Sequence, residues 1–138
     1  MKDYELIEHT ADIGIRVVAK DLKGLFENTA AAIFDIMAEV KHSGSLAKKT
    51  IEITQTADDW DGLLVNWLNE LLSLSATKEL IFSDFKILQL EKNRLKAQVT
   101  ATDLKNYQVK CEIKAATYHE LEIKNTADRW QVQVILDV

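Results

Sequence analysis

The sequence contains no proline, four glycines and one cysteine among its 138 residues. Linkers between domains are usually rich in proline, glycine or serine, so this scarcity predicts a single domain over residues 1–138. Because Cys111 is the only cysteine, no internal disulfide can form, which favours a reducing, cytoplasmic setting. Cys111 stands in the alternating segment Val109–Ile113, and we interpret it as a core-facing strand residue rather than a nucleophile.

Long hydrophobic runs are missing as well. No stretch approaches the roughly 20 apolar residues that a membrane-spanning helix needs. The segment from Met1 to Glu8 lacks the apolar run of a signal peptide. We therefore expect neither export nor membrane insertion.

Positive charge is scarce relative to negative charge: 17 lysines and arginines stand against 22 aspartates and glutamates, for a formal net charge of -5. Non-specific nucleic-acid binding depends mainly on cations that displace phosphate counterions, so direct RNA binding is disfavoured. An acidic surface suits a metal cation or a basic partner protein, although a modest excess of this kind also keeps an ordinary domain in solution. Both interpretations remain open.

The motifs of familiar enzyme classes are absent from the sequence. His9, His42 and His119 lack the paired spacing of a zinc site, and there is no set of cysteines to join them. Each glycine stands alone, so there is no phosphate loop, dinucleotide fingerprint or nucleophile elbow. The sequence therefore predicts no catalytic residue.

Hydrophobic periodicity predicts both helices and strands. Apolar residues at spacings of three and four predict amphipathic helices over Leu22–Val40 and from Trp60 onward, the second after a polar start at Thr56–Asp59. Period-two alternation predicts the strands Tyr4–His9, Ile13–Lys20, Thr50–Thr54, Phe85–Leu90, Leu95–Ala101, Val109–Ala115, Tyr118–Lys124 and Trp130–Asp137. The predicted fold is α+β: one two-layer domain with a largely antiparallel sheet and two amphipathic helices packed on one of its faces.

The two ends of the chain hold the most informative polar residues. Asp12 stands directly before a strand and close to Gly14, where backbone can approach a ligand or another strand. At the other end, alternation turns Asp137 away from the core, one residue from the α-carboxylate of Val138. Two anions this close repel unless a cation or hydrogen-bond donors compensate them. From these residues alone, a plain turn and a frayed, solvated terminus are the favoured explanations.

Several segments resemble the archease family in the same order along the chain. They are Tyr4–Ile13 (YELIEHTADI), Trp67–Leu72 (WLNELL), Lys114–His119 (KAATYH) and Val134–Val138 (VILDV). The first of these is a specific match, and together they span nearly the whole chain. Ala116 stands where a bulkier residue is common in the family, which affects no metal ligand.

The resemblance implies an accessory protein rather than an enzyme. Its expected partner is the tRNA-splicing ligase RtcB, which joins a 2′,3′-cyclic or 3′-phosphate end to a 5′-hydroxyl with GTP. The accessory protein is expected to promote guanylylation and repeated turnover, and to meet nucleic acid only through the ligase. The family's divalent metal site, usually assigned to calcium, carries over to Asp12, Asp137 and the carboxylate of Val138. Lys114 matches a family lysine and is a possible partner contact.

Two alternatives to ligase activation stay open. The same fold could act as a general protein-binding chaperone or modulator of RNA-processing enzymes such as tRNA methyltransferases, with a metal that is only structural. It could also be a metal-dependent hydrolase, which would need a general base and an open metal position.

Overall fold

The computed structural model describes residues 4–7, 12–41 and 47–138. Two long helices occur in these ranges, α1 (Leu22–Met37) and α2 (Trp60–Lys78). The strands are β1 (Tyr4–Ile7), β2 (Ile13–Ala19), β3 (Ala38–Val40), β4 (Lys48–Thr56), β5 (Leu80–Glu91), β6 (Arg94–Asp103), β7 (Tyr107–Val109), β8 (Ala115–Thr126) and β9 (Arg129–Asp137), with one 3-10 turn, η1 (Leu104–Asn106), before β7. No described helix is long and apolar enough to cross a membrane.

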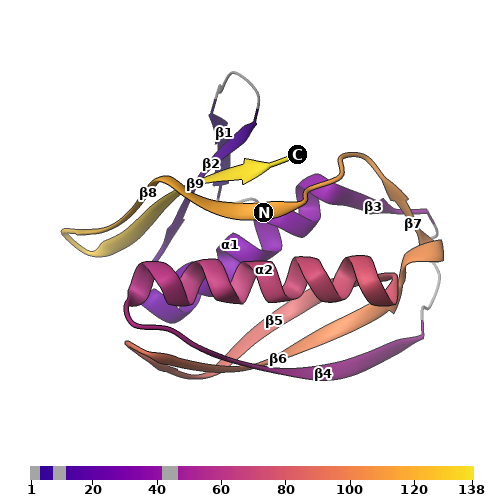
Figure 1. The fold of residues 1–138 in the computed structure, drawn as a ribbon, viewed down its shortest axis with the longest axis horizontal. Helices are drawn as coiled ribbons and strands as arrows, with labels where there is room; N and C mark the ends of the chain where they lie inside the picture. Colours follow the sequence, from indigo (N-terminus) through magenta and orange to yellow (C-terminus); the bar gives the residue numbers. More distant parts are fainter. Residues whose placement is uncertain (1–3, 8–11, 42–46) are drawn as a thin grey trace.

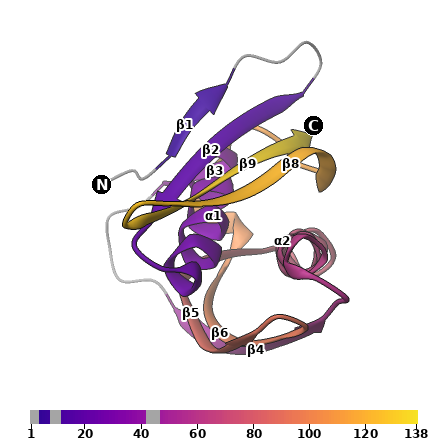
Figure 2. The same cartoon turned by 90° about the vertical axis from the view of Figure 1, so that its left-hand side faces the viewer.

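The strands form separate antiparallel sheets with the helices between them (Figures 1 and 2). One sheet has the order β1-β2-β9-β8, the second has the order β4-β6-β5, and β3 pairs with β7 as a small third sheet. Figure 2 shows α1 and α2 lying side by side, with the first sheet above them and the second below. Helix α1 contacts β2 and β5, and α2 contacts β8 and β4, so each helix packs on both larger sheets.

The predicted α+β class, the antiparallel pairing and the two helices are confirmed. The arrangement differs from the predicted one, in which the helices cover one face of a single sheet. The described strands divide into three sheets, and the helices form a layer between the two larger ones. A middle layer buries a wide stripe of each helix. The buried stripe of α1 includes Thr29, which lies four residues after Leu25 and four before Ile33, and Ala32 at its margin, and that of α2 includes Val65. Such small or isolated residues add little to the apolar periodicity of a sequence.

Both helix starts are fixed by aspartate caps. The Asp21 side chain accepts a hydrogen bond from the Gly24 N–H at 2.7 Å, and the Asp59 side chain accepts one from the Gly62 N–H at 2.8 Å. Such caps satisfy N–H groups that have no partner inside the helix. Helix α1 ends at Met37, three residues before the predicted end, because Ala38 is extended and begins β3.

The prediction of a core-facing strand over Val109–Ala115 is wrong. Strand β7 ends at Val109, whose side chain is 49% exposed, and residues 110–114 are not in a strand. The Met37 carbonyl accepts hydrogen bonds from both the Lys110 and Cys111 N–H groups, at 2.7 and 3.2 Å, so these two donors pair with a helix end instead of a sheet. Cys111 is half-buried and packs against the core from this irregular segment.

Trp67 ties the two helices together at the centre of the core. Its side chain is fully buried, and its indole N–H donates to the Phe26 carbonyl of α1 at 3.0 Å. A buried indole N–H needs such a partner, because an unsatisfied donor costs about 1–3 kcal/mol. This bond fixes the position of α2 relative to α1.

Asn69 of α2 ties the helix layer to the edge strand β8. Its side-chain amide donates to the Ala116 carbonyl at 3.1 Å, and its side-chain oxygen accepts from the Ala116 N–H at 2.7 Å. The side chain thus satisfies both backbone groups of Ala116, as a neighbouring strand would. Ala116 lies one residue after Ala115, which pairs with Asp137. Asn69 therefore also helps to position this end of the sheet relative to α2.

We predict that Asn69→Ala lowers the free energy of unfolding by about 1–3 kcal/mol, because both Ala116 backbone groups lose their partners. Asn69→Asp should also destabilise, because a carboxylate still accepts from the N–H but cannot donate to the carbonyl. Urea unfolding followed by circular dichroism measures both changes. Ser73→Ala, an exposed position on the same helix, is the matched control and should stay within about 0.5 kcal/mol of the parent. Equal stability of Asn69→Ala and the control would contradict the proposed role of Asn69.

Candidate functional site

The pairing of β2 with β9 brings residues from the two ends of the chain together. Its last pair is Ile13 with Leu136, so one further step of the antiparallel register sets Asp12 opposite Asp137. Directly opposed residues of antiparallel strands have Cβ atoms about 4.5–5.5 Å apart. Asp12 is half-buried and Asp137 is exposed. The two predicted carboxylates therefore stand at neighbouring strand ends.

Asp137 lies on the sheet face that is turned away from the helices, as predicted. Val132, Val134 and Leu136 are fully buried in the main core, and the alternation of β9 puts Asp137 on the opposite side. Asp12 falls on the same outer face, because the outer pair Gly14 and Ile135 lies two residues before Asp137 and two after Asp12. Two carboxylates on one face of adjacent strands can share a cation.

Strand β8 flanks Asp137 on its other side. Ala115 pairs with Asp137, and the Lys114 N–H donates to the Asp137 carbonyl at 2.8 Å. The Lys114 side chain is exposed. The predicted site residues Asp12, Asp137, Val138 and Lys114 thus all lie at one end of the same sheet.

Gly14 allows the first two strands to approach each other closely beside this end. A Cβ added at Gly14 would lie 3.1 Å from the Ile7 Cβ and 3.2 Å from the Ile135 Cδ1. Ile135 is only 1% exposed although it lies on the outer face, outside the main core cluster. Ile135 packs over Gly14, in space that a larger side chain at position 14 would occupy.

The donor set fits a hard divalent cation. Calcium prefers oxygen ligands, accepts carboxylates in varied geometry and keeps waters in its coordination shell. In the part of the chain that the structure describes, no three His, Cys, Asp or Glu side chains gather around a possible ion. A site with Asp12 and Asp137 would therefore need the Val138 carboxylate and water as further donors. Glu8, His9 and Thr10, also singled out from the sequence, lie outside the described residues.

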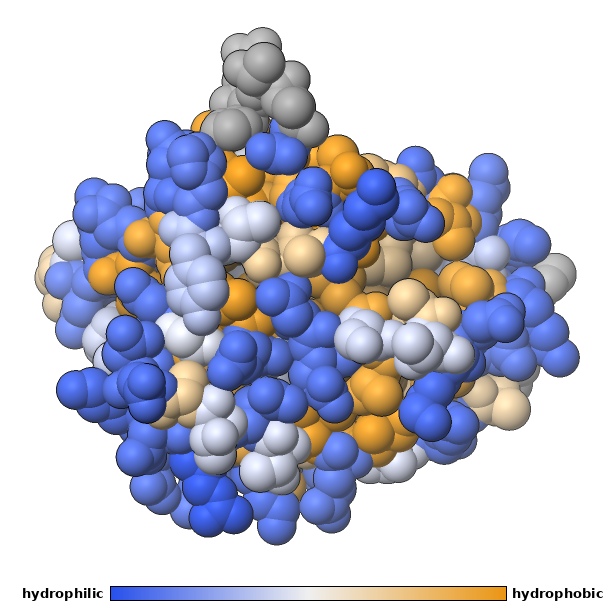
Figure 3. Space-filling model, viewed as in Figure 1, coloured by the Kyte–Doolittle hydropathy of each residue, from blue (hydrophilic) through white to orange (hydrophobic). Residues whose placement is uncertain are grey.

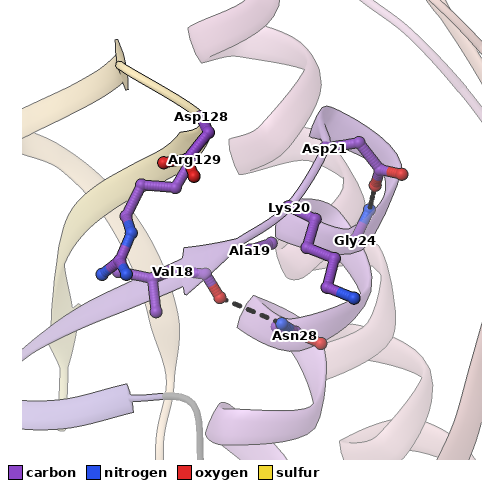
Figure 4. Close-up of a pocket in the computed structure, with 8 residues that line it drawn as sticks. All are labelled: Val18, Ala19, Lys20, Asp21, Gly24, Asn28, Asp128 and Arg129. Carbon is purple, nitrogen blue, oxygen red and sulfur yellow. Dashed lines mark hydrogen bonds between the residues drawn. The ribbon is translucent and has the colours of Figure 1, made fainter.

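A cavity of about 600 Å³ opens at the other end of β2 and β9 (Figure 4). Its polar side chains serve local structure: Asp21 caps α1, and the Asn28 amide donates to the Val18 carbonyl at 3.0 Å. Lys20, Arg129 and Asp128 also line it. This mixture lacks a nucleophile with a base beside it, so the cavity gives no support for an enzyme.

The raised pKa of Asp61 also has a structural cause. Burial raises the pKa of Asp61, and the nearby Asp59 carboxylate raises it further. Both lie at the start of α2, where Asp59 is the helix cap. On the face shown in Figure 3, small apolar areas alternate with charged ones and form no single large patch. The paired carboxylates of β2 and β9 are therefore the strongest candidate site.

We predict that Gly14→Ala lowers the free energy of unfolding by about 1–3 kcal/mol, because the added methyl group overpacks against Ile7 and Ile135. Ile135→Val alone should cost about 0.5–1.5 kcal/mol. In the double variant the shortened side chain leaves room for the methyl group, so the loss should be smaller than the sum of the two single losses. A thermal-unfolding double-mutant cycle measures this coupling, and strict additivity would show that the two residues do not compete for space.

Comparisons with known proteins show the family of the chain. The chain matches the Archease protein family (MTH1598/TM1083) over residues 4–138. It is 38% identical to the protein archease of Methanosarcina barkeri, over 99% of this chain and 97% of the relative, and 37% identical to that of Pyrococcus furiosus, over the full length of both.

Solved structures give the same result. The solution structure of protein 1598 from Methanobacterium thermoautotrophicum covers 100% of both chains with a TM-score of 0.73 and 32% identity. A crystal structure from Thermotoga maritima, described as an archease and possible chaperone, shares the fold with a TM-score of 0.68 over 96% of this chain and 94% of that chain, at 23% identity. The match extends over both helices and over the sheet end that carries Asp12 and Asp137, and the chain belongs to the archease family.

Proposed function

We propose that this chain is an accessory protein, not itself an enzyme, that activates an RtcB-type, GTP-dependent RNA ligase in tRNA splicing or RNA repair. It would promote guanylylation of the ligase and repeated turnover through a carboxylate-bound divalent metal, with calcium as the expected ion. The observation that carries the proposal is the β2–β9 register, which sets Asp12 opposite Asp137 on an outer sheet face.

Each residue has a distinct part in this proposal. The carboxylates of Asp12, Asp137 and Val138 hold the ion, and the exposure of Asp137 leaves room for a second macromolecule to approach it. The hydrogen bond from Lys114 to the Asp137 carbonyl keeps that strand end in place. The ion supplies positive charge that can offset phosphate charge on the ligase nucleotide.

Partner recognition follows from charge. The net charge of -5 disfavours direct RNA binding, so the RNA is met through the ligase. Lys114 is exposed beside the carboxylate pair, and its ammonium group could contact an acidic group or nucleotide phosphate of the ligase. The proposed interface therefore contains one cationic side chain at the margin of an anionic site.

We predict that Asp12→Asn and Asp137→Asn each abolish the stimulation of multiple-turnover ligation and reduce the rate to that of the ligase alone. The assay combines purified RtcB-type ligase, GTP, and RNA ends bearing a 2′,3′-cyclic phosphate and a 5′-hydroxyl. Calorimetric titration with calcium measures ion binding separately, and both variants should lose it because an amide is a weaker, neutral ligand.

Asp128→Asn is the matched control, because Asp128 is exposed in the turn between β8 and β9, at the far end of the strand that carries Asp137. It makes the same chemical change and should keep full stimulation and calcium binding. Full stimulation by Asp12→Asn and Asp137→Asn would reject the proposed metal site. Absence of stimulation by the parent protein would reject ligase activation altogether.

A chaperone function is the second candidate, because the Thermotoga maritima relative is described as a possible chaperone. In that case the chain would bind several RNA-processing enzymes, such as tRNA methyltransferases, and the metal would serve stability alone. Affinity capture from a cell extract separates the two functions. One dominant ligase partner would support activation, whereas a broad set of clients retained by Asp137→Asn would support the chaperone function.

A further inference from the structure

A second surface, distinct from the carboxylate pair, lies along the flank of α1. There a groove of about 650 Å³ runs between α1 and β5, with β3 and Tyr107 at one end. Figure 2 shows α1 above β5, on the side of the molecule away from α2. The carboxylate pair lies elsewhere, on the outer face of the β1-β2-β9-β8 sheet. The groove and the metal-site candidate therefore face different surroundings.

Three phenylalanine rings make the groove floor. Phe34 of α1 meets Phe82 at a ring-centroid distance of 5.6 Å and an angle of 84°, and meets Phe85 at 5.8 Å and 32°. Phe34 and Phe82 are only 4% and 1% exposed, whereas Phe85 is half-buried. Ring packing thus fixes the floor, and Phe85, which also packs edge-on against Trp67, is the one of the three phenylalanines that is not fully buried.

Carboxylates surround this apolar floor. Glu27, Asp35, Glu39 and Asp84 all line the groove, and no lysine or arginine does so among the described residues. Glu27 accepts from the Ile87 N–H at 2.9 Å, a neutral donor, and Asp35 accepts from the Tyr4 hydroxyl at 2.6 Å. Glu39 and Asp84 are exposed. The groove therefore combines an apolar floor with an anionic rim.

The aromatic floor beside these carboxylates favours one kind of cation. A bare metal ion would leave that floor unused, and no three of the carboxylates gather as possible ligands of one ion in the described part of the groove. Phosphate groups of RNA would be repelled by the rim. An arginine side chain fits both parts of the groove, because its planar guanidinium stacks on aromatic rings, pairs with separated carboxylates and is weakly hydrated. Its aliphatic stem also suits the apolar wall.

We propose that this groove docks an arginine side chain presented by a partner protein, with the guanidinium against Phe85 and paired with Glu39 and Asp84. Lysine fits less well, since its ammonium is a compact, strongly hydrated charge that does not stack as a plane. The groove gives the protein a contact with a basic partner segment that is independent of any metal at Asp12 and Asp137.

The experiment titrates the peptide acetyl-Gly-Arg-Gly-Arg-Gly-amide into the full-length, isotope-labelled protein and follows backbone amide NMR shifts. We expect saturable shifts of the Glu39, Asp84 and Phe85 amides. The double variant Glu39→Gln/Asp84→Asn should bind about tenfold more weakly, since it loses charge-assisted hydrogen bonds. The spectra of the variant themselves report whether its fold is intact.

The matched control is Glu52→Gln/Glu91→Gln, which removes the same charge from exposed positions on β4 and β5. It should bind the peptide like the parent protein. Peptides with citrulline or lysine in place of arginine should bind more weakly, because citrulline lacks the charge and lysine lacks the planar group.

Three results would overturn the proposal. The first is equal affinity of the groove variant and its control, which would indicate general attraction to an acidic surface. The second is a set of shifts outside the groove. The third is competition by a short single-stranded RNA for the same amides, which would make the groove a nucleic-acid site.

Discussion

The pairing of β2 with β9 is the constraint on which the proposed function depends. It joins a strand near the start of the chain to the last strand, and its register sets Asp12 opposite Asp137. A shift by one residue would turn every side chain of β9 to the other face and would expose Val132, Val134 and Leu136. The three fully buried side chains thus hold the register that aligns the carboxylates, so core packing determines the geometry at the surface.

The two helices connect this strand pair to the rest of the core through hydrogen bonds of α2. Trp67 anchors α2 to α1 through the Phe26 carbonyl, and Asn69, two residues later, anchors α2 to Ala116 of β8. Ala116 lies beside the residue that pairs with Asp137. One short segment of α2 therefore contacts both the centre of the core and the strand that flanks the carboxylate pair. This segment is also among those that resemble the archease family, and the structure gives a physical reason for its residues.

Sequence patterns predicted the elements better than their arrangement. Period-two alternation placed β2, β6 and β9 correctly, because each has one face in the core and one outside. The division into separate sheets was not predictable from local periodicity, since it depends on which strands pair. The segment after Val109 was misread for a similar reason: its alternation is real, but Met37 takes the hydrogen bonds of Lys110 and Cys111.

The residues of the candidate site were also only partly predictable from the sequence. Alternation alone turned Asp137 outward, and the resemblance to archeases selected Asp12 and Val138 as its partners. The roles of Asn69 and Gly14 were not predictable, because one depends on a helix-to-strand contact and the other on space that two isoleucines leave. The α1 groove combines residues of α1, β3, β5 and β7, which no segment of sequence brings together.

The two acidic surfaces of this chain differ in what lies beside their carboxylates, and these surroundings decide which cation each can bind. Opposed residues on adjacent strands converge on one point, which suits a small ion that accepts several oxygens at once. Carboxylates around phenylalanine rings suit a flat, extended cation with an apolar stem. A net negative charge by itself distinguishes neither ligand. The distinction arises because the β2–β9 register sets two carboxylates opposite each other at one place, whereas the packing of α1 on β5 sets carboxylates around an aromatic floor at the other.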